Sequence, residues 1–191
     1  MPRIDNDRFY KNALKKHGAT AKGLNWYDDY SQIRRFEVIF ALLEEDLYDD
    51  DTIIDAGCGF GDFYHYVSQY RQIDYIGYEI VTENVAIARE RTGQKIVRKD
   101  ILTDPLEEAD FYIASGSMNI LSRFETYLFI ERCFEHSRKG FLFNLPYGKD
   151  ESRSFNYFLP QEIKHFCKKF GCEIITRTGY LPNDFTVCLK V

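Results

Sequence analysis

The chain has 191 residues, 45% of them hydrophobic and 29% charged, which is enough for one soluble domain with a full hydrophobic core. Its formal net charge of −5 is opposite in sign to the basic surface of most nucleic-acid-binding proteins, so nucleic acid is a less favoured partner. The sequence has neither a long apolar run nor an apolar N-terminal signal core, which predicts a cytoplasmic protein without membrane contact. The odd number of cysteines, without Cys-x-x-Cys spacing, predicts reduced thiols.

Two helices are predicted before the first strand. The first runs from Asp5 to His17 and ends at Gly18, and a loop over 19–26 follows. The second helix, over about 28–46, has an apolar stripe of Ile33, Phe36, Ile39, Phe40 and Leu43. We predict a single domain, 1–191, in which residues 1–48 are additional to a core over 49–191.

The central motif of the chain is Thr52 to Phe63, Thr-Ile-Ile-Asp-Ala-Gly-Cys-Gly-Phe-Gly-Asp-Phe. Its β-branched start predicts a buried parallel strand, and the alternating glycines that follow predict a tight turn. Beyond the turn, apolar residues recur at helical spacing: Phe63, Tyr66, Val67 and Tyr70. Glycine reaches positive φ without strain and lets a ligand lie against the backbone, so we expect a binding site here.

A dinucleotide site is one alternative for this turn. That site requires Gly-x-Gly-x-x-Gly with a pyrophosphate on the helix N-terminus. The spacing here is Gly57-x-Gly59-x-Gly61, and Asp62 stands where the third glycine would be. A carboxylate in the first turn of a helix repels phosphate, so we expect a ligand without a pyrophosphate.

The run Asp55-Ala-Gly-Cys-Gly-Phe-Gly61 resembles the first motif of class I S-adenosylmethionine-dependent methyltransferases. The resemblance implies that Asp55, Gly57, Cys58, Gly59 and Gly61 bind S-adenosyl-L-methionine. This cofactor carries an ammonium and a sulfonium but no phosphate, which suits acidic surroundings. The alternative is a glycine turn that binds nothing.

Further acidic residues follow at the expected strand ends. Ile73 to Ile80 is a predicted strand that places Glu79 where adenosine-binding α/β folds have an acid that accepts hydrogen bonds from the ribose, with Ile80 beside it. A helix over 82–91, with Thr82 as N-cap and Gly93 beyond its end, leads to a strand over 95–98. The methyltransferase resemblance implies that Asp100 then binds the adenine amine and that Ile101 contributes its backbone and an apolar contact.

The same resemblance implies that residues 1–48 fold over the cofactor site as a lid. Trp26, Gln32 and Arg35 are then candidate cofactor contacts. Arg35 would pair with the cofactor carboxylate, because a guanidinium can donate to both oxygens.

A fourth strand is predicted over 109–115, ending in Gly116-Ser-Met-Asn119. Ligands in open α/β sheets gather at the carboxyl ends of the strands, so we expect Ser115 to border the cofactor and Ser117 and Asn119 to border the substrate. A helix over about 122–137 should direct five side chains toward the sheet: Phe124, Tyr127, Leu128, Cys133 and Phe134.

The fifth predicted strand, Phe141 to Leu145, ends in Asn144-Leu-Pro-Tyr147. This tetrapeptide resembles the motif with which adenine-N6 methyltransferases hold an extruded base, but in that family it follows the fourth strand. We therefore interpret Asn144 and Tyr147 as a substrate-side edge. A nucleic-acid adenine methyltransferase remains the alternative.

The rest of the chain completes the fold. Residues 149–158 are either a flap or a packed loop, Pro160 starts a helix that stops at Gly171, and residues 172–178 and 185–191 predict a β-hairpin. The methyltransferase resemblance therefore spans nearly the whole chain. It implies an α/β, Rossmann-like class I methyltransferase fold: a seven-stranded, mostly parallel sheet with an antiparallel C-terminal strand and an N-terminal helical lid.

The implied activity is methyl transfer from S-adenosyl-L-methionine to an unidentified small molecule or protein group. A non-catalytic module that binds the cofactor is a further alternative. No metal site is predicted, because the sequence has no zinc spacing and no carboxylate cluster of the kind that holds magnesium. No catalytic base is assigned, and the oligomeric state is not predicted.

Overall fold

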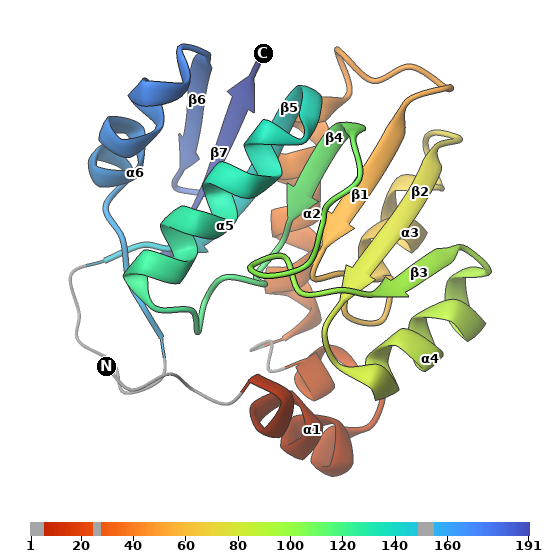
Figure 1. Ribbon diagram of the computed structural model, residues 1–191. Coiled ribbons are helices and arrows are strands. Elements are labelled where there is room, and N and C mark those ends of the chain that lie inside the picture. Colours follow the sequence, from red (N-terminus) through yellow and green to blue (C-terminus); the bar gives the residue numbers. More distant parts are fainter. Residues whose placement is uncertain (1–5, 25–27, 149–154) are drawn as a thin grey trace.

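The computed structural model describes residues 6–24, 28–148 and 155–191, which form one sheet with helices on both faces (Figure 1). The strands are β1 (Thr52–Ala56), β2 (Asp74–Glu79), β3 (Lys95–Arg98), β4 (Ala109–Ala114), β5 (Ser137–Pro146), β6 (Glu173–Thr178) and β7 (Asp184–Lys190). The helices are α1 (Asn6–His17), α2 (Asp29–Leu43), α3 (Asp62–Val67), α4 (Thr82–Thr92), α5 (Arg123–Glu135) and α6 (Pro160–Cys167), with short 3₁₀ helices η1 (Ala21–Leu24) and η2 (Lys168–Phe170).

The seven strands lie in the order β3-β2-β1-β4-β5-β7-β6. Strands β1 to β5 pair in parallel, whereas β7 is antiparallel to both β5 and β6. The order reverses between β1 and β4, and a ligand in an open α/β sheet binds at such a switch point. This topology confirms the predicted fold class.

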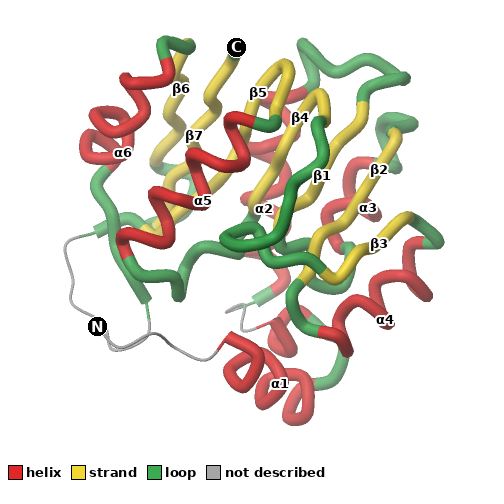
Figure 2. Tube along the Cα trace, in the orientation of Figure 1, coloured by secondary structure: helices red, strands yellow, loops and turns green. Residues whose placement is uncertain are grey.

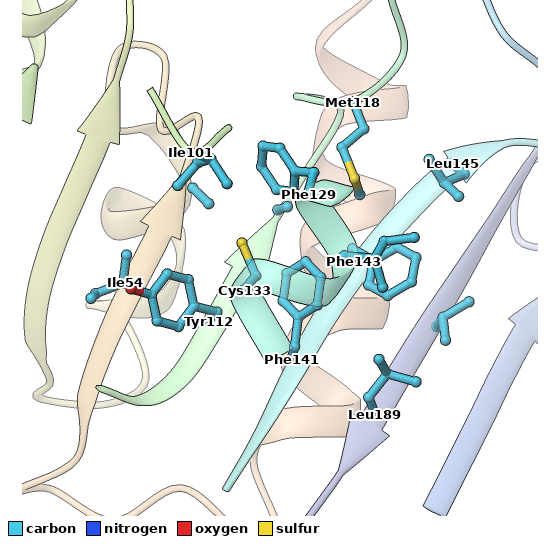
Figure 3. Close-up of a cluster of buried hydrophobic side chains, with 14 of the residues drawn as sticks. Ile54, Ile101, Tyr112, Met118, Phe129, Cys133, Phe141, Phe143, Leu145 and Leu189 are labelled. Atoms are coloured by element: carbon cyan, nitrogen blue, oxygen red, sulfur yellow. The ribbon is translucent and has the colours of Figure 1, made fainter. Parts of the chain in front are cut away.

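One face of the sheet is covered by α5 and α6, which lie in front of the strands in Figure 1. Figure 3 shows this cluster of buried side chains: Phe129 and Cys133 of α5 lie among Tyr112 of β4 and Phe141 and Phe143 of β5. Met118, in the loop after β4, is buried in the same cluster, so this loop is anchored to the core.

The other face is covered by α2, α3 and α4. The buried side chains of α2 (Phe36, Ile39, Phe40 and Leu43) pack with Ile53 of β1, Ile113 of β4 and Leu142 of β5. Helix α2 therefore belongs to the core layer, and the predicted boundary at residue 48 does not separate a lid from the core.

Three residues of the predicted apolar stripes are exposed: Ile33, Phe124 and Tyr70, the last of which lies beyond the end of α3. Ile33 of α2 is 45% exposed, and the buried place beside it belongs to Gln32, whose amide donates to Asp62 of α3. Phe124 of α5 is 76% exposed, and Thr126 is buried in its place because its hydroxyl donates to a carbonyl of the preceding turn. A polar side chain can thus occupy a buried helical position when its hydrogen bond is made, either to a neighbouring helix, as for Gln32, or within its own helix, as for Thr126.

The predicted helix ends also need small corrections. Helix α3 ends at Val67 rather than Tyr70, and the N-cap of α4 is Val81 rather than Thr82. Gly93 does end α4, in the left-handed conformation. Within the described residues, no helix combines the length and the apolar character needed to cross a membrane.

The carboxyl ends of β1 to β4 lie along one edge of the sheet. In Figure 2, α1 lies below this edge, next to α4, and Lys11 of α1 forms an ion pair of 3.4 Å with Glu83 of α4. The N-terminal segment is thereby tied to the end of the sheet at which ligands bind in this kind of fold.

Candidate functional site

A cavity lies at the carboxyl ends of β1, β2 and β4, with about 1080 Å³ of space not filled by protein atoms, including the part open to solvent. The structure brings most of the predicted site residues to its wall: Gln32, Asp55, Gly57, Cys58, Gly59, Glu79, Ile80, Asp100, Ile101, Ser115, Ser117 and Asn119.

The glycine turn is packed closely on two sides. Gly57 has φ +90°, and a Cβ added there would lie 2.3 Å from the Cβ of Ser117; a Cβ on Gly59 would lie 2.7 Å from Leu24 of η1. No side chain fits between this turn and the segments beside it. Gly61 does not line the cavity: a Cβ there would lie 2.3 Å from Thr92 of α4, so this glycine permits helix packing rather than ligand contact.

Asp55 is 3% exposed, at the end of β1. Its Oδ2 accepts a hydrogen bond of 2.7 Å from the Tyr75 hydroxyl. Burial, together with the charges of Glu79 and Asp62, raises the pKa of Asp55 to about 7, against the opposing effect of the Tyr75 hydrogen bond. Among the described residues, no cation forms an ion pair with Asp55.

Glu79 is 7% exposed, at the end of β2. Its Oε2 accepts from the backbone N–H of Gly59 at 3.0 Å, and its Oε1 accepts from that of Val81 at 2.9 Å. Burial raises the pKa of Glu79 to about 7, although these hydrogen bonds favour its charged form. Glu79 thus links the glycine turn of β1 to the loop that follows β2.

The loop after β3 carries Asp100 and Ile101. Asp100 Oδ1 accepts from the backbone N–H of Leu102 at 2.9 Å, which closes a turn and leaves the carboxylate at the cavity wall. Lys99 also lines the cavity, but its ammonium pairs with Glu107 at 3.6 Å and lies 4.6 Å from the centre of the Tyr78 ring. Its charge is therefore already partnered.

The described part of the cavity wall is acidic. Four carboxylates line it, those of Asp55, Asp62, Glu79 and Asp100, against the single cation Lys99. Of the four, Asp62 has a cationic partner, Arg91 at 2.6 Å. Such a wall attracts a positively charged ligand and repels phosphate.

Three buried polar atoms of residues that line the cavity have no hydrogen-bond partner within the described part of the chain: Ser117 Oγ, Asn84 Oδ1 and the Tyr78 hydroxyl. Asn84, which is not among the residues predicted from the sequence, lies in the first turn of α4 and is 1% exposed. Its position was readable, because Asn84, Ala88 and Thr92 follow at a spacing of four on the buried side of this helix. A polar residue that opens such a stripe next to an acidic strand end is a candidate for ligand contact.

The predicted contacts of the N-terminal segment have different outcomes. Gln32 lines the cavity, where its amide donates to Asp62 at 3.1 Å. Arg35 does not: its guanidinium lies 2.5 Å from Asp184, a residue only 3% exposed at the start of β7, and Tyr180 donates to the same carboxylate. The structure thus gives Arg35 a partner within the protein rather than a place at the cavity wall. Trp26 lies outside the described residues.

Asn144 and Tyr147 do not line the cavity either. Asn144 is 1% exposed, its Oδ1 accepts from the Gly116 N–H at 2.9 Å, and its Nδ2 donates to Ser115 at 3.2 Å. Asn144 therefore holds the loop after β4 in place. Tyr147 is 39% exposed and packs edge-to-face on Phe185. The tetrapeptide lies at the end of the fifth strand, as predicted, and not of the fourth.

No group of three or more His, Cys, Asp or Glu side chains that could hold a metal occurs among residues 6–24, 28–148 and 155–191. Phe155 lines the cavity, whereas residues 149–154 of the predicted flap lie outside the described part of the chain.

No protein-family model matches the sequence, and no curated protein matches it significantly. Solved structures do match the fold. Magnesium protoporphyrin IX methyltransferase (ChlM) from Synechocystis, solved with bound SAM, has a TM-score of 0.74 at 13% identity, over 100% of this chain and 99% of that one.

Two further matches agree with this one. An S-adenosylmethionine-dependent methyltransferase from Clostridium acetobutylicum has a TM-score of 0.67 at 12% identity, over 96% of this chain and 98% of that one. A TehB-like SAM-dependent methyltransferase from Corynebacterium glutamicum has a TM-score of 0.69 at 14% identity, over 97% and 99%. The fold of this chain is therefore that of the class I methyltransferases, and its cavity lies at the switch point of that fold.

Proposed function

We propose that this protein is an S-adenosylmethionine-dependent methyltransferase that acts on a small molecule or a protein group. The observation that carries the proposal is the cavity at the switch point, where the ends of three strands supply carboxylates that have no cationic partner among the described residues: Asp55, Glu79 and Asp100. A ligand with positive charges and no phosphate complements such a wall. S-adenosylmethionine has these properties.

The residues at the wall fit the parts of this ligand. Asp55 would supply negative potential near its positive charges, and the apolar side chains of Ile101 and Leu102 would pack on its adenine ring. Glu79 would keep the Gly59 backbone in position, and the close packing of Gly57 under Ser117 leaves no room for water between them. The fold of the solved methyltransferases described above supports the same placement.

The bound cofactor would supply an activated methyl group on a sulfonium. When the methyl group is transferred, the sulfur would leave as a neutral thioether. The chain would then bind and orient the cofactor and the acceptor and exclude water. These contributions can lower the barrier by ~7–11 kcal/mol. The proposal assigns no catalytic base to the chain.

A small molecule or protein group is the proposed acceptor because of charge. The chain has a net charge of −5 and the cavity wall is acidic, so a polyanionic nucleic acid would be repelled. The position of Asn144 agrees with this choice, since its amide is engaged by Gly116 and Ser115 and is not presented to a base.

Binding can be tested by isothermal titration with S-adenosylmethionine on the wild type and on Gly57→Ala. The added methyl group would overlap Ser117, so we expect affinity to fall by at least tenfold, which is about 1.4 kcal/mol. Gly93→Ala is the matched control: Gly93 also has positive φ, +67°, but has nothing within 4 Å of an added Cβ. It should bind like the wild type.

Activity can be tested with S-adenosylmethionine carrying a labelled methyl group, incubated with cell extract and separated into protein, RNA and small-molecule fractions. We expect label in the protein or small-molecule fraction, and none with Gly57→Ala. Label in RNA alone would overturn the proposed acceptor class. Absence of binding by the wild type would overturn the cofactor assignment itself.

A further inference from the structure

The antiparallel end of the sheet leaves β6 with a neighbour on one side only. In the order β3-β2-β1-β4-β5-β7-β6 it is the last strand, paired with β7 (Figure 1). No backbone group of β6 bonds to another segment on its outer side within the part of the chain that the structure describes. An open edge of six residues can pair with a further strand.

The other edge strand, β3, is built differently. It has only four residues, and both of its ends carry cations, Lys95 and Arg98. A short strand with charged ends discourages edge-to-edge pairing. Strand β6 is longer, and its two charges have opposite signs: Glu173 and Arg177, both of them exposed. The two edges therefore differ in their capacity to pair.

The direction of the backbone groups decides which residues of β6 face outward. The Val191 N–H donates to the Lys139 carbonyl of β5 at 2.9 Å. Because backbone groups alternate along a strand, the odd-numbered residues of β7 face β5 and the even-numbered ones face β6. The register places these even-numbered residues opposite Glu173, Ile175 and Arg177. The N–H and C=O groups of Ile174 and Thr176 therefore point away from the sheet.

One antiparallel register of two β6 strands brings opposite charges together. In this register Ile174 of each copy exchanges hydrogen bonds with Thr176 of the other, and Ile175 lies opposite its own counterpart on a two-fold axis. Glu173 then lies opposite Arg177 at both ends, in pairs without backbone hydrogen bonds, where side chains are closest. A shift by two residues in either direction separates these charges.

The two charges are available for this contact. Among the described residues, neither Glu173 nor Arg177 forms an ion pair. The Arg177 guanidinium donates only to the Thr176 carbonyl, at 3.4 Å, so it lies along the open edge. Glu173 is opposite Lys190, but the ammonium of Lys190 pairs with Asp46 at 2.5 Å. Beside Arg177, a groove between α2 and β6 has an apolar lining of Val38, Ala41 and Leu42.

We propose that β6 is the surface through which two copies of this chain form a symmetric dimer, with Glu173 of each copy paired to Arg177 of the other. The partner is a second copy because the charge pattern of β6 is complementary to itself in the antiparallel direction. The proposal does not depend on the ligand of the cavity and goes beyond the proposed function.

The test is sedimentation velocity over a range of micromolar concentrations, in which the wild type should show an equilibrium between monomer and dimer. Arg177→Glu places carboxylates opposite each other, and Glu173→Arg does the same with guanidinium groups. Each variant alone should dimerise at least about tenfold more weakly than the wild type. An equimolar mixture of the two variants should form a heterodimer about as strong as the wild-type dimer, because every cation then faces a carboxylate.

Glu90→Arg is the matched control, because Glu90 is exposed on α4, which lies next to β3 at the other edge of the sheet (Figure 1). This variant should dimerise like the wild type. A wild type that stays monomeric throughout the range would overturn the proposal. Single variants that dimerise like the wild type would also overturn it, as would a mixture that fails to associate. Recovery of the dimer in the mixture shows that the single variants are folded.

Discussion

Carboxylates at the amino ends of the central strands have cationic partners in the protein, whereas the buried carboxylates at the carboxyl ends do not have them among the described residues. At the amino ends, Asp51 accepts from Lys139 at 2.5 Å, and Asp110 accepts from Arg138 at 3.0 Å. Burial raises the pKa of Asp110, but the hydrogen bonds from Arg138 and from the Thr52 backbone outweigh it, and the net shift is downward. The acids at this end are neutralised by the protein.

At the carboxyl ends, Asp55 and Glu79 are buried about as deeply as Asp51 and more deeply than Asp110, whose side chain is 17% exposed, and the described residues supply them with hydrogen-bond donors and no cation. Burial, with no cation to offset it, raises their pKa values to about 7. Asp51 and Asp110 thus have their counter-charge within the protein, whereas Asp55 and Glu79 would receive it from the proposed ligand. Three experiments test this difference.

The largest expected effect is on ligand affinity in Asp55→Asn. The substitution keeps the shape of the side chain but removes the charge that faces a cationic ligand, and we expect S-adenosylmethionine to bind about 30- to 100-fold more weakly, or about 2–3 kcal/mol. The free energy of unfolding of the ligand-free protein should not fall, because the lost charge had no ionic partner among the described residues. Titration calorimetry and urea unfolding measure the two quantities. Unchanged affinity would refute the assignment of Asp55.

The second effect is a pH dependence of stability. The pKa values of Asp55 and Glu79 rise from 3.8 and 4.5 to about 7, so between these limits the folded state holds protons that the unfolded state has lost. The contribution of these two carboxyls to the free energy of unfolding is therefore full below their pKa values in the unfolded chain. It is lost as the pH rises toward 7, by up to about 1.4 kcal/mol per pH unit for each carboxyl.

Urea unfolding of the ligand-free protein at about pH 5 and about pH 7.5 measures this loss. Asp55→Asn should show a smaller difference between the two conditions, because one of the two carboxyls is removed. Saturating S-adenosylmethionine should reduce the difference as well, since a cation favours the ionised forms. A wild-type stability that rises over this window would contradict the pKa shifts.

The smallest effect is expected for Asp51→Asn at the opposite end of β1. Asp51 accepts from Lys139 and from the Tyr48 backbone N–H, and Lys139 is 35% exposed, so the charged pair is partly screened. We expect the free energy of unfolding to fall by about 1 kcal/mol, with no change in affinity for S-adenosylmethionine. A loss of affinity in this variant would show that acids at both ends serve the ligand, and the contrast would fail.

Much of this fold could be predicted from local patterns in the sequence. The turn after β1 needs glycine, because a Cβ at Gly57 or Gly59 has no room, and the acids follow strands whose apolar runs are plain in the sequence. The order of the strands then brings those strand ends together. The motifs along the chain predicted a mostly parallel seven-stranded sheet, but not the order of its strands.

Tertiary structure alone decided which polar groups have partners. The sequence does not show that Arg35 reaches Asp184, 149 positions away, that Asn144 holds the loop after β4, or that Gly61 faces α4 instead of the ligand. It also does not show that Glu79 accepts from the backbone N–H groups of Gly59 and Val81, while Asn84 Oδ1 has no partner among the described residues. The physical reason is that residue type and spacing fix what a side chain can donate or accept, whereas only the packed chain determines which groups come within hydrogen-bonding distance.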